Sequence, residues 1–188
     1  MSSGHIKQLF LQSARNYEKL AELAPLVAQT ADNIIESLRT GGKVMFCGNG
    51  GSAADAQHLA AELMGRYLID RKPLAAMALS VNTSTMTAVS NDYSYDEVFD
   101  RQLRGIGRTG DVLVGISTSG NSTNVIRAVK AAREMDILTI GLTGENGGEM
   151  GSICDVCIRV PSTSTPRIQE MHIAVGHAIC EIVENAFA

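Results

Sequence analysis

The sequence predicts an α/β fold in which a doubly wound, five-stranded parallel sheet is flanked by helices and preceded by an N-terminal helical hairpin. From Lys43 onward, short apolar segments alternate with longer helical stretches, as in a sheet whose strands are joined by helical crossovers. The short segments are apolar throughout, as expected of parallel strands that are covered on both faces.

The composition is that of one globular domain spanning residues 1–188, with 45% hydrophobic and 19% charged residues. The net charge is −4 and Lys/Arg residues form no cluster, which argues against nucleic acid as the main ligand. No apolar run reaches the ~18 residues of a membrane span, and no secretory signal is visible at the N-terminus. We therefore expect a cytoplasmic protein with no membrane partner.

Residues 3–40 are predicted to be helical, with a break near Pro25. An apolar stripe at helical spacing comprises Leu20, Leu23, Val27, Ile34, Ile35 and Leu38. This hairpin carries more apolar surface than one small sheet covers. We therefore expect residues 1–40 to take part in oligomerisation and residues 41–188 to form the α/β core.

The core alternates regularly between the two kinds of element. The predicted strands are 44–47, 75–79, 112–116, 138–142 and 156–160, and the predicted helices are 52–66, 83–106, 122–135 and 166–187. Sites in such folds lie at the carboxyl ends of the strands. The loops at those ends are 48–52, 80–83, 117–122 and 143–148.

The segment from Gly115 to Asn124 is the most informative of these loops, because it joins an apolar strand to a helix start. It carries four hydroxyl residues, Ser117, Thr118, Ser119 and Ser122. A helix start offers free N–H groups and a partial positive charge, so the segment predicts a phosphate cradle built without lysine. The alternative is a hydroxyl-rich turn that only caps the helix. A cap needs one hydroxyl, and this segment has four, which favours the phosphate cradle.

The first strand ends in Gly48-Asn-Gly-Gly-Ser-Ala53, which matches the dinucleotide fingerprint G-x-G-x-x-A. A nucleotide site also needs an acidic residue at the end of the second strand, but residues 80–82 are Ser-Val-Asn, and Asp70 precedes that strand. A glycine loop capped by Ser52 suits a small polar ligand equally well.

Two helices carry the candidate catalytic groups. His58 and Glu62 are four residues apart and share a helical face, a pair that alone is more often a surface hydrogen bond. Thr165 is the predicted N-cap of the final helix and Pro166 its first residue.

The final helix has two faces of different character. One face is apolar and comprises Ile168, Met171, Val175, Ala178, Ile179, Ile182 and Ala186. The other is mixed and comprises Gln169, Ile173, Gly176, His177 and Cys180. We therefore expect the helix to be buried on two sides, and we expect His172 to be a structural, hydrogen-bonded histidine.

Four cysteines occur, of which Cys154 and Cys157 have the spacing of a redox or metal pair. They lie where the chain enters an apolar strand, and a spacing of three places side chains on opposite faces of a strand. We expect these two residues, Cys47 and Cys180 to be ordinary buried or half-buried thiols, as in a reducing cytoplasm.

Several linked motifs together resemble the phosphoheptose isomerases, a family of sugar-isomerase (SIS) domains with a flavodoxin-like fold. The resemblance runs from about residue 5 to the C-terminus. Its motifs are Cys47-Gly-Asn-Gly-Gly-Ser52, Gln57-His58 with Glu62, Asn91-Asp92, Gly115-Ile-Ser-Thr-Ser-Gly-Asn-Ser122, Leu142-Thr-Gly144 with Gly147-Gly148, and Arg167-Ile-Gln-Glu-Met-His172 with His177.

The resemblance implies an aldose–ketose isomerase that converts sedoheptulose 7-phosphate to D-glycero-D-manno-heptose 7-phosphate, the first step toward nucleotide-activated heptose for lipopolysaccharide or other surface glycans. It assigns Glu62 as general base and His177 as general acid. The implied substrate-binding residues are Asn49, Gly50, Gly51, Ser52, Glu62, Asn91, Asp92, Ser117, Thr118, Ser119, Ser122 and Gln169.

The resemblance also implies one zinc ion per subunit, since some family members bind zinc through residues that match His58, Glu62, Gln169 and His177. Gln169 and His177 are eight residues apart, or ~12 Å along a helix axis, so they reach one site only by leaning together or from different subunits. This spacing, together with the tetrameric state that the resemblance implies, predicts a homotetramer.

The rival interpretation is a non-catalytic SIS-domain assembly factor that binds the bacterial replication initiator. That relative lacks the acid and the imidazole at the positions of Glu62 and His177, and both are present here. A sugar-phosphate-sensing regulatory domain is disfavoured because no DNA-binding module is attached.

Overall fold

The structure, a computed structural model, describes residues 3–188 and contains one five-stranded, all-parallel sheet. The strands are β1 (Val44–Gly48), β2 (Ala76–Ala78), β3 (Val112–Ile116), β4 (Leu138–Thr143) and β5 (Val156–Arg159). Their order across the sheet is β2-β1-β3-β4-β5. This confirms the predicted doubly wound α/β fold.

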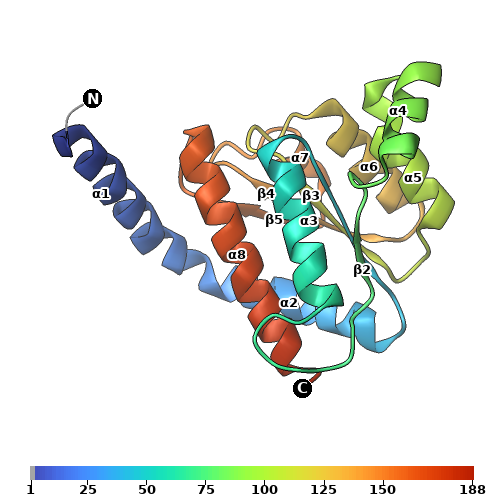
Figure 1. The fold of residues 1–188 in the computed structure, drawn as a ribbon, viewed down its shortest axis with the longest axis horizontal. Coiled ribbons are helices and arrows are strands. Elements are labelled where there is room, and N and C mark those ends of the chain that lie inside the picture. The colour runs from blue at the N-terminus through green and yellow to red at the C-terminus, as the bar shows by residue number, and fades with distance from the viewer. Residues whose placement is uncertain (1–2) are drawn as a thin grey trace.

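Helices cover both faces of the sheet, as Figure 1 shows. One face packs against α2 (Ala24–Arg39), α3 (Gly51–Met64) and α8 (Thr165–Asn185), and the other against α5 (Val98–Ile106), α6 (Thr123–Glu134) and α7 (Met150–Ile153). β1, β3 and most of β4 are buried, which explains why these segments are apolar throughout.

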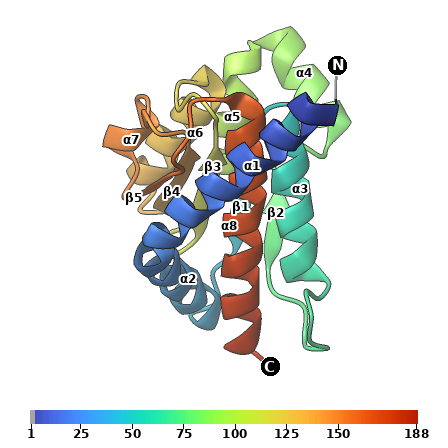
Figure 2. The same cartoon turned by 90° about the vertical axis from the view of Figure 1, so that its left-hand side faces the viewer.

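The N-terminal segment is helical and breaks where it was predicted to break. α1 (Ser3–Leu20) ends in a short 3₁₀ helix, η1 (Ala21–Leu23), and α2 follows with Pro25 in its first turn. α1 points away from α2 and crosses over α8, so most of α1 lies away from the body of the molecule (Figures 1 and 2). No residue of α1 is buried in the single chain.

The helical stretch predicted over roughly 83–106 is divided into three shorter helices. It comprises α4 (Thr83–Asp92), the 3₁₀ helix η2 (Tyr95–Glu97) and α5. Tyr93 and Ser94 leave helical geometry, with φ, ψ of −128°, −92° and −163°, 160°. The turn redirects the chain so that Val98, Phe99 and Leu103 are buried against the sheet.

Two smaller expectations need correction. The N-cap of α3 is Gly50, not Ser52, and the N-cap of α8 is Ser164, one residue before Thr165. Among residues 3–188, no helix is long and apolar enough to cross a bilayer.

The four cysteines are free thiols, with Cys47 and Cys180 buried and the other two half-buried. The prediction that Cys154 and Cys157 lie on opposite faces is wrong. A Cβ built on Gly141 would lie 3.0 Å from one sulfur and 3.4 Å from the other, so both face the same position. Cys154 precedes β5, so strand alternation does not apply to it.

Candidate active site

The candidate site lies where the strand order reverses, between β1 and β3. The chain leaves β1 into α3 on one face of the sheet and leaves β3 into α6 on the other. A crevice opens at the carboxyl ends of such a strand pair, and it is the usual ligand site of doubly wound folds. The two loops that meet there are 48–52 and 117–122.

The glycine loop, residues 48–52, brings the start of α3 close to the end of β3. Gly50 has φ +56°, in the left-handed region that favours glycine. A Cβ on Gly48 would lie 2.9 Å from the carbonyl oxygen of Ile116 and 2.8 Å from Cβ of Ser52, so only glycine permits this approach. Ser52 is thereby held, buried, near the end of β3.

The hydroxyl-rich segment, which was predicted to be a phosphate cradle, forms a compact turn between β3 and α6. The Ser117 and Ser122 hydroxyls are 2.9 Å apart, and the Ser119 hydroxyl accepts a hydrogen bond from the N–H of Asn121 at 3.1 Å. Ser119 is exposed, whereas Ser117 is buried. The free N–H groups at the start of α6 add donors beside these hydroxyls.

The loop after β4 supports the cradle. The N–H of Gly144 donates to the carbonyl of Thr118, and the N–H of Met150 donates to the carbonyl of Gly120, at 3.1 and 3.0 Å. The N–H of Glu149 donates to the Asn121 side chain at 2.9 Å. These bonds tie the cradle to a second loop of the same sheet edge.

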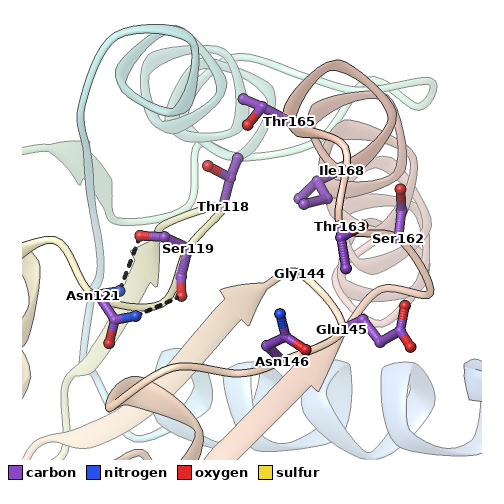
Figure 3. A pocket seen from close by; sticks show the side chains of 10 residues that line it. All are labelled: Thr118, Ser119, Asn121, Gly144, Glu145, Asn146, Ser162, Thr163, Thr165 and Ile168. Atoms are coloured by element: carbon purple, nitrogen blue, oxygen red, sulfur yellow. Dashed lines mark hydrogen bonds between the residues drawn. The ribbon is translucent and has the colours of Figure 1, made fainter.

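A polar cavity of about 280 Å³ opens beside the cradle, and Figure 3 shows its lining. Ser119 and Asn121 lie on one side, Gly144 to Asn146 on another, and the start of α8 closes it. The full lining is Thr118, Ser119, Asn121, Gly144, Glu145, Asn146, Ser162, Thr163, Thr165 and Ile168. The segment before α8 therefore also lines the cavity.

The predicted acid–base groups converge from α3 and α8, which lie side by side in Figure 1. The Nε2 atom of His58 lies 2.9 Å from Nε2 of His177 and 3.2 Å from Oε1 of Glu62. A Cβ on Gly176 would lie 2.5 Å from the Leu59 side chain, so this glycine lets the two helices approach closely. The tight packing brings the three side chains together.

The ligand atoms of His58, Glu62 and His177 all lie within 4.8 Å of one another. Two imidazoles and a carboxylate are a known catalytic zinc set, and tetrahedral ligands at ~2.0–2.1 Å are about 3.3 Å apart. The measured separations of 2.9 and 3.2 Å are close to that spacing. The residues present therefore fit a metal ion.

Gln169, the fourth predicted ligand, lies elsewhere. Its amide nitrogen is 2.5 Å from the position of a Cβ on Gly51, at the start of α3. Gly51 and His58 are seven residues apart, or about 10 Å along the helix axis. In this chain, Gln169 therefore lies against the glycine loop rather than beside the His58, Glu62 and His177 group.

The other predicted sugar contacts, Asn91 and Asp92, lie at the exposed end of α4. The Asn91 amide donates to the Asp92 carboxylate at 2.9 Å. Shortly after them, the Tyr95 hydroxyl donates to the side chain of Asn49 at 2.9 Å. This contact joins the α4–η2 segment to the glycine loop.

Sequence reasoning missed the loop that closes the other end of α3. The buried Glu184 carboxylate accepts hydrogen bonds from the N–H groups of residues 67–69 at 2.5–2.8 Å. Arg71, also buried, lies 3.3 Å from Glu184 and donates to the backbone carbonyls of Glu62 and Leu63. Burial raises the pKa of Glu184, but these N–H donors and Arg71 outweigh it, so the pKa is lowered. No local sequence pattern marks this pair.

Two further residues beside the acid–base group were also missed. The Tyr67 ring lies 5.5 Å from the His177 ring, and burial followed by nearby acidic groups raises the pKa of its hydroxyl. Burial likewise raises the pKa of Asp55, against the influence of His58. The Oδ2 atom of Asp55 is buried and has no hydrogen-bond partner within residues 3–188.

His172 differs from the hydrogen-bonded histidine that was predicted. It is fully buried, and neither ring nitrogen has a well-formed hydrogen bond to any residue from 3 to 188. Burial lowers its pKa to about 4, only partly opposed by the nearby backbone of Thr143. The ring is therefore a neutral core group.

Comparisons with known proteins show the family to which the chain is similar. The SIS-domain family model matches residues 10–144. A phosphoheptose isomerase of Rhodospirillum rubrum is 62% identical over 94% of this chain and 95% of its own, and one of Akkermansia muciniphila is 55% identical over 97% of each. The structure of phosphoheptose isomerase GmhA from Neisseria gonorrhoeae matches with a TM-score of 0.92 at 47% identity, over 97% of this chain and 98% of that one.

Proposed function

This chain belongs to the phosphoheptose isomerases of the SIS-domain family and is an aldose–ketose isomerase for sedoheptulose 7-phosphate, and we propose that Glu62 and His177 transfer the protons. The observation that carries this proposal is the convergence of these two side chains between the packed helices α3 and α8. The product is D-glycero-D-manno-heptose 7-phosphate.

The reaction moves one carbon-bound proton and one oxygen-bound proton. Glu62 removes a proton from C1 of the open-chain ketose while His177 gives a proton to the oxygen on C2, which yields an enediol. Glu62 then returns its proton to C2, and His177 takes the proton from the oxygen on C1. One carboxylate and one imidazole therefore complete the cycle and end in their starting states.

The phosphate end fixes the register of the sugar. The hydroxyls of the cradle, with the N–H groups at the start of α6, hold the phosphate away from the reacting carbons. The proposed phosphate contacts are Ser52, Ser117, Thr118, Ser119 and Ser122, and the proposed sugar contacts are Asn49, Gly50, Gly51, Asn91, Asp92 and Gln169. Such remote binding orients C1 and C2 without taking part in the chemistry.

We also propose one zinc ion per subunit, held by His58, Glu62 and His177. A zinc ion held by these residues would supply Lewis-acid stabilisation of the negative charge that develops on the sugar. Gln169 joins the set only if its side chain turns away from Gly51.

The N-terminal segment supports a homotetramer. α1 crosses over α8 with much of its surface free (Figure 2), and Ile6, Leu9, Phe10 and Tyr17 expose apolar surface. An apolar cavity of about 320 Å³ lies between α1–α2 and α8. We propose that residues 1–40 pack against other subunits there. Sedimentation of an active monomer would contradict this proposal.

The product would be a precursor of nucleotide-activated heptose for lipopolysaccharide or other surface glycans. The four free thiols are compatible with a cytoplasmic location. The assembly-factor interpretation is not favoured, because the acid and the imidazole both stand in the site.

The test is to incubate metal-stripped and zinc-replete protein with sedoheptulose 7-phosphate and to follow an aldose heptose 7-phosphate by NMR. Aldose formation by the wild type and its loss in Glu62→Gln are expected. No turnover in either metal state, with a folded oligomer, would overturn the proposal.

A further inference from the structure

The side chain of Asn49 is already engaged within the protein. Its Nδ2 donates to Oδ1 of Asn124 at 2.8 Å, and Nδ2 of Asn124 donates back to Oδ1 of Asn49 at 2.9 Å. The Tyr95 hydroxyl donates to the same Asn49 oxygen at 2.9 Å. An amide oxygen has two lone pairs, so Oδ1 of Asn49 has no free capacity for a sugar hydroxyl.

The three residues come from three different crossovers of the sheet. Asn49 belongs to the glycine loop after β1, Asn124 to the first turn of α6 after β3, and Tyr95 to η2 between α4 and α5. Each of these segments contains or adjoins groups proposed above to bind the substrate. The network therefore links the phosphate cradle and the glycine loop to the segment that follows Asn91 and Asp92.

The centre of the network is rigidly held. Asn124 is 3% exposed, and its Oδ1 also accepts a hydrogen bond from the N–H of Val125 at 3.0 Å. A buried amide with satisfied donors and acceptors is costly to disturb, because each lost partner leaves a polar group unpaired. Tyr95, in contrast, is half exposed and contributes through its hydroxyl.

We propose that Asn124 and Tyr95 are positioning residues that act through Asn49 to set the three substrate-binding segments in register. On this proposal, which rests on the proposed function, Asn49 meets the sugar with its backbone, and its side chain spaces the loops. Loops are the mobile part of a fold, and a phosphate-anchored sugar tolerates little error in the distance between the cradle and the reacting carbons.

The cleanest variant is Tyr95→Phe, because it removes one hydroxyl and keeps the ring. We expect the KM and the dissociation constant for sedoheptulose 7-phosphate to rise about three- to tenfold, the effect of one lost hydrogen bond, while kcat stays within about twofold. The matched control is Tyr93→Phe. Tyr93 is similarly exposed, and the Arg101 guanidinium lies over its ring. The KM of the Tyr93→Phe variant should stay at the wild-type value.

A double-mutant cycle tests whether Tyr95 acts through Asn49. In an Asn49→Ala background, Tyr95→Phe should change the dissociation constant no further, because its partner is already gone. An unchanged KM in Tyr95→Phe, or an equal effect with and without Asn49, would overturn the positioning role.

Measuring binding by calorimetry beside turnover separates this inference from the proposed function. Absent turnover in the wild type would count against the isomerase, whereas the ratio of dissociation constants between Tyr95→Phe and the wild type reports on the network in either case. A ratio near one would contradict the network whatever the turnover.

Discussion

The Nε2 atoms of His58 and His177 lie 2.9 Å apart, although 119 positions separate the two residues in the chain. Glu62 lies 3.2 Å from the same nitrogen of His58. The three groups meet because Gly176 lets α8 pack tightly against Leu59 of α3. The helix packing thus brings together the side chains that we propose as base, acid and metal ligands.

Glu62→Gln should remove the base while preserving the shape of the side chain. We expect kcat to fall by about 10²–10⁴-fold and the dissociation constant for sedoheptulose 7-phosphate to change little. The control is Glu181→Gln, an exposed carboxylate one turn after His177. A Glu62→Gln enzyme with near wild-type kcat would disprove the role of base.

His58→Gln should weaken zinc binding. Loss of an outer-shell partner already costs about 10–100-fold in metal affinity, and loss of a direct ligand should cost at least as much. Metal content after dialysis against zinc, measured by mass spectrometry, gives the answer. Cys154→Ser is the control, and a loss of zinc in that variant instead would place the metal at the cysteine pair.

Ser119→Ala should weaken the phosphate cradle. Hydrogen bonds to a charged group contribute about 1.5–3 kcal/mol, so we expect KM to rise about tenfold or more, with a smaller change in kcat. Steady-state kinetics with sedoheptulose 7-phosphate measure both constants. Ser152→Ala, which alters an exposed serine on α7, should behave as wild type; an unchanged KM in Ser119→Ala would exclude that hydroxyl from the cradle.

His172 should make stability fall as the pH drops below 6.5. Its pKa is about 4 in the folded protein, whereas an unfolded histidine titrates near 6.5, so between these values only the unfolded chain takes up the proton. Above pH 6.5 His172 is neutral in both states and does not reduce the free energy of unfolding. As the pH falls from 6.5 to 4, its titration lowers that free energy by about 3 kcal/mol.

Urea unfolding at fixed protein concentration between pH 5 and 7 measures this slope. His172→Gln should flatten it. The lowered pKa of Glu184 also favours the folded state, but that contribution is lost only below about pH 4.5, outside this range. An equal slope in the variant would show that another group controls the acid sensitivity.

Glu184→Gln should destabilise the protein strongly, because Arg71 would remain buried without its partner. Removing one member of a buried ion pair costs about 3–5 kcal/mol. Lys130→Gln breaks the exposed pair with Glu149 and should cost about 1 kcal/mol or less. Denaturant unfolding of both variants tests the difference, and equal losses of unfolding free energy would contradict the structural role of the buried Glu184–Arg71 pair.

Local patterns in the sequence were enough to predict the five strands and the loops at the carboxyl ends of the strands. Apolar runs such as Val112–Ile116 and turns such as Gly48–Ser52 depend on neighbours a few residues away. The break between α4 and α5 and the facing sulfurs of Cys154 and Cys157 were not predicted, because they depend on how the chain is redirected to pack.

The sequence by itself determined the fold class, the position of the hydroxyl-rich loop at the carboxyl end of β3, and the residue types proposed to carry the chemistry. Only the tertiary structure decided that His58 and His177 meet while Gln169 lies against Gly51, that Asn124 occupies the amide of Asn49, and that His172 is fully buried in the core. These relationships join elements far apart in the chain. Their distances follow from side-chain packing between helices and loops, which no local periodicity records.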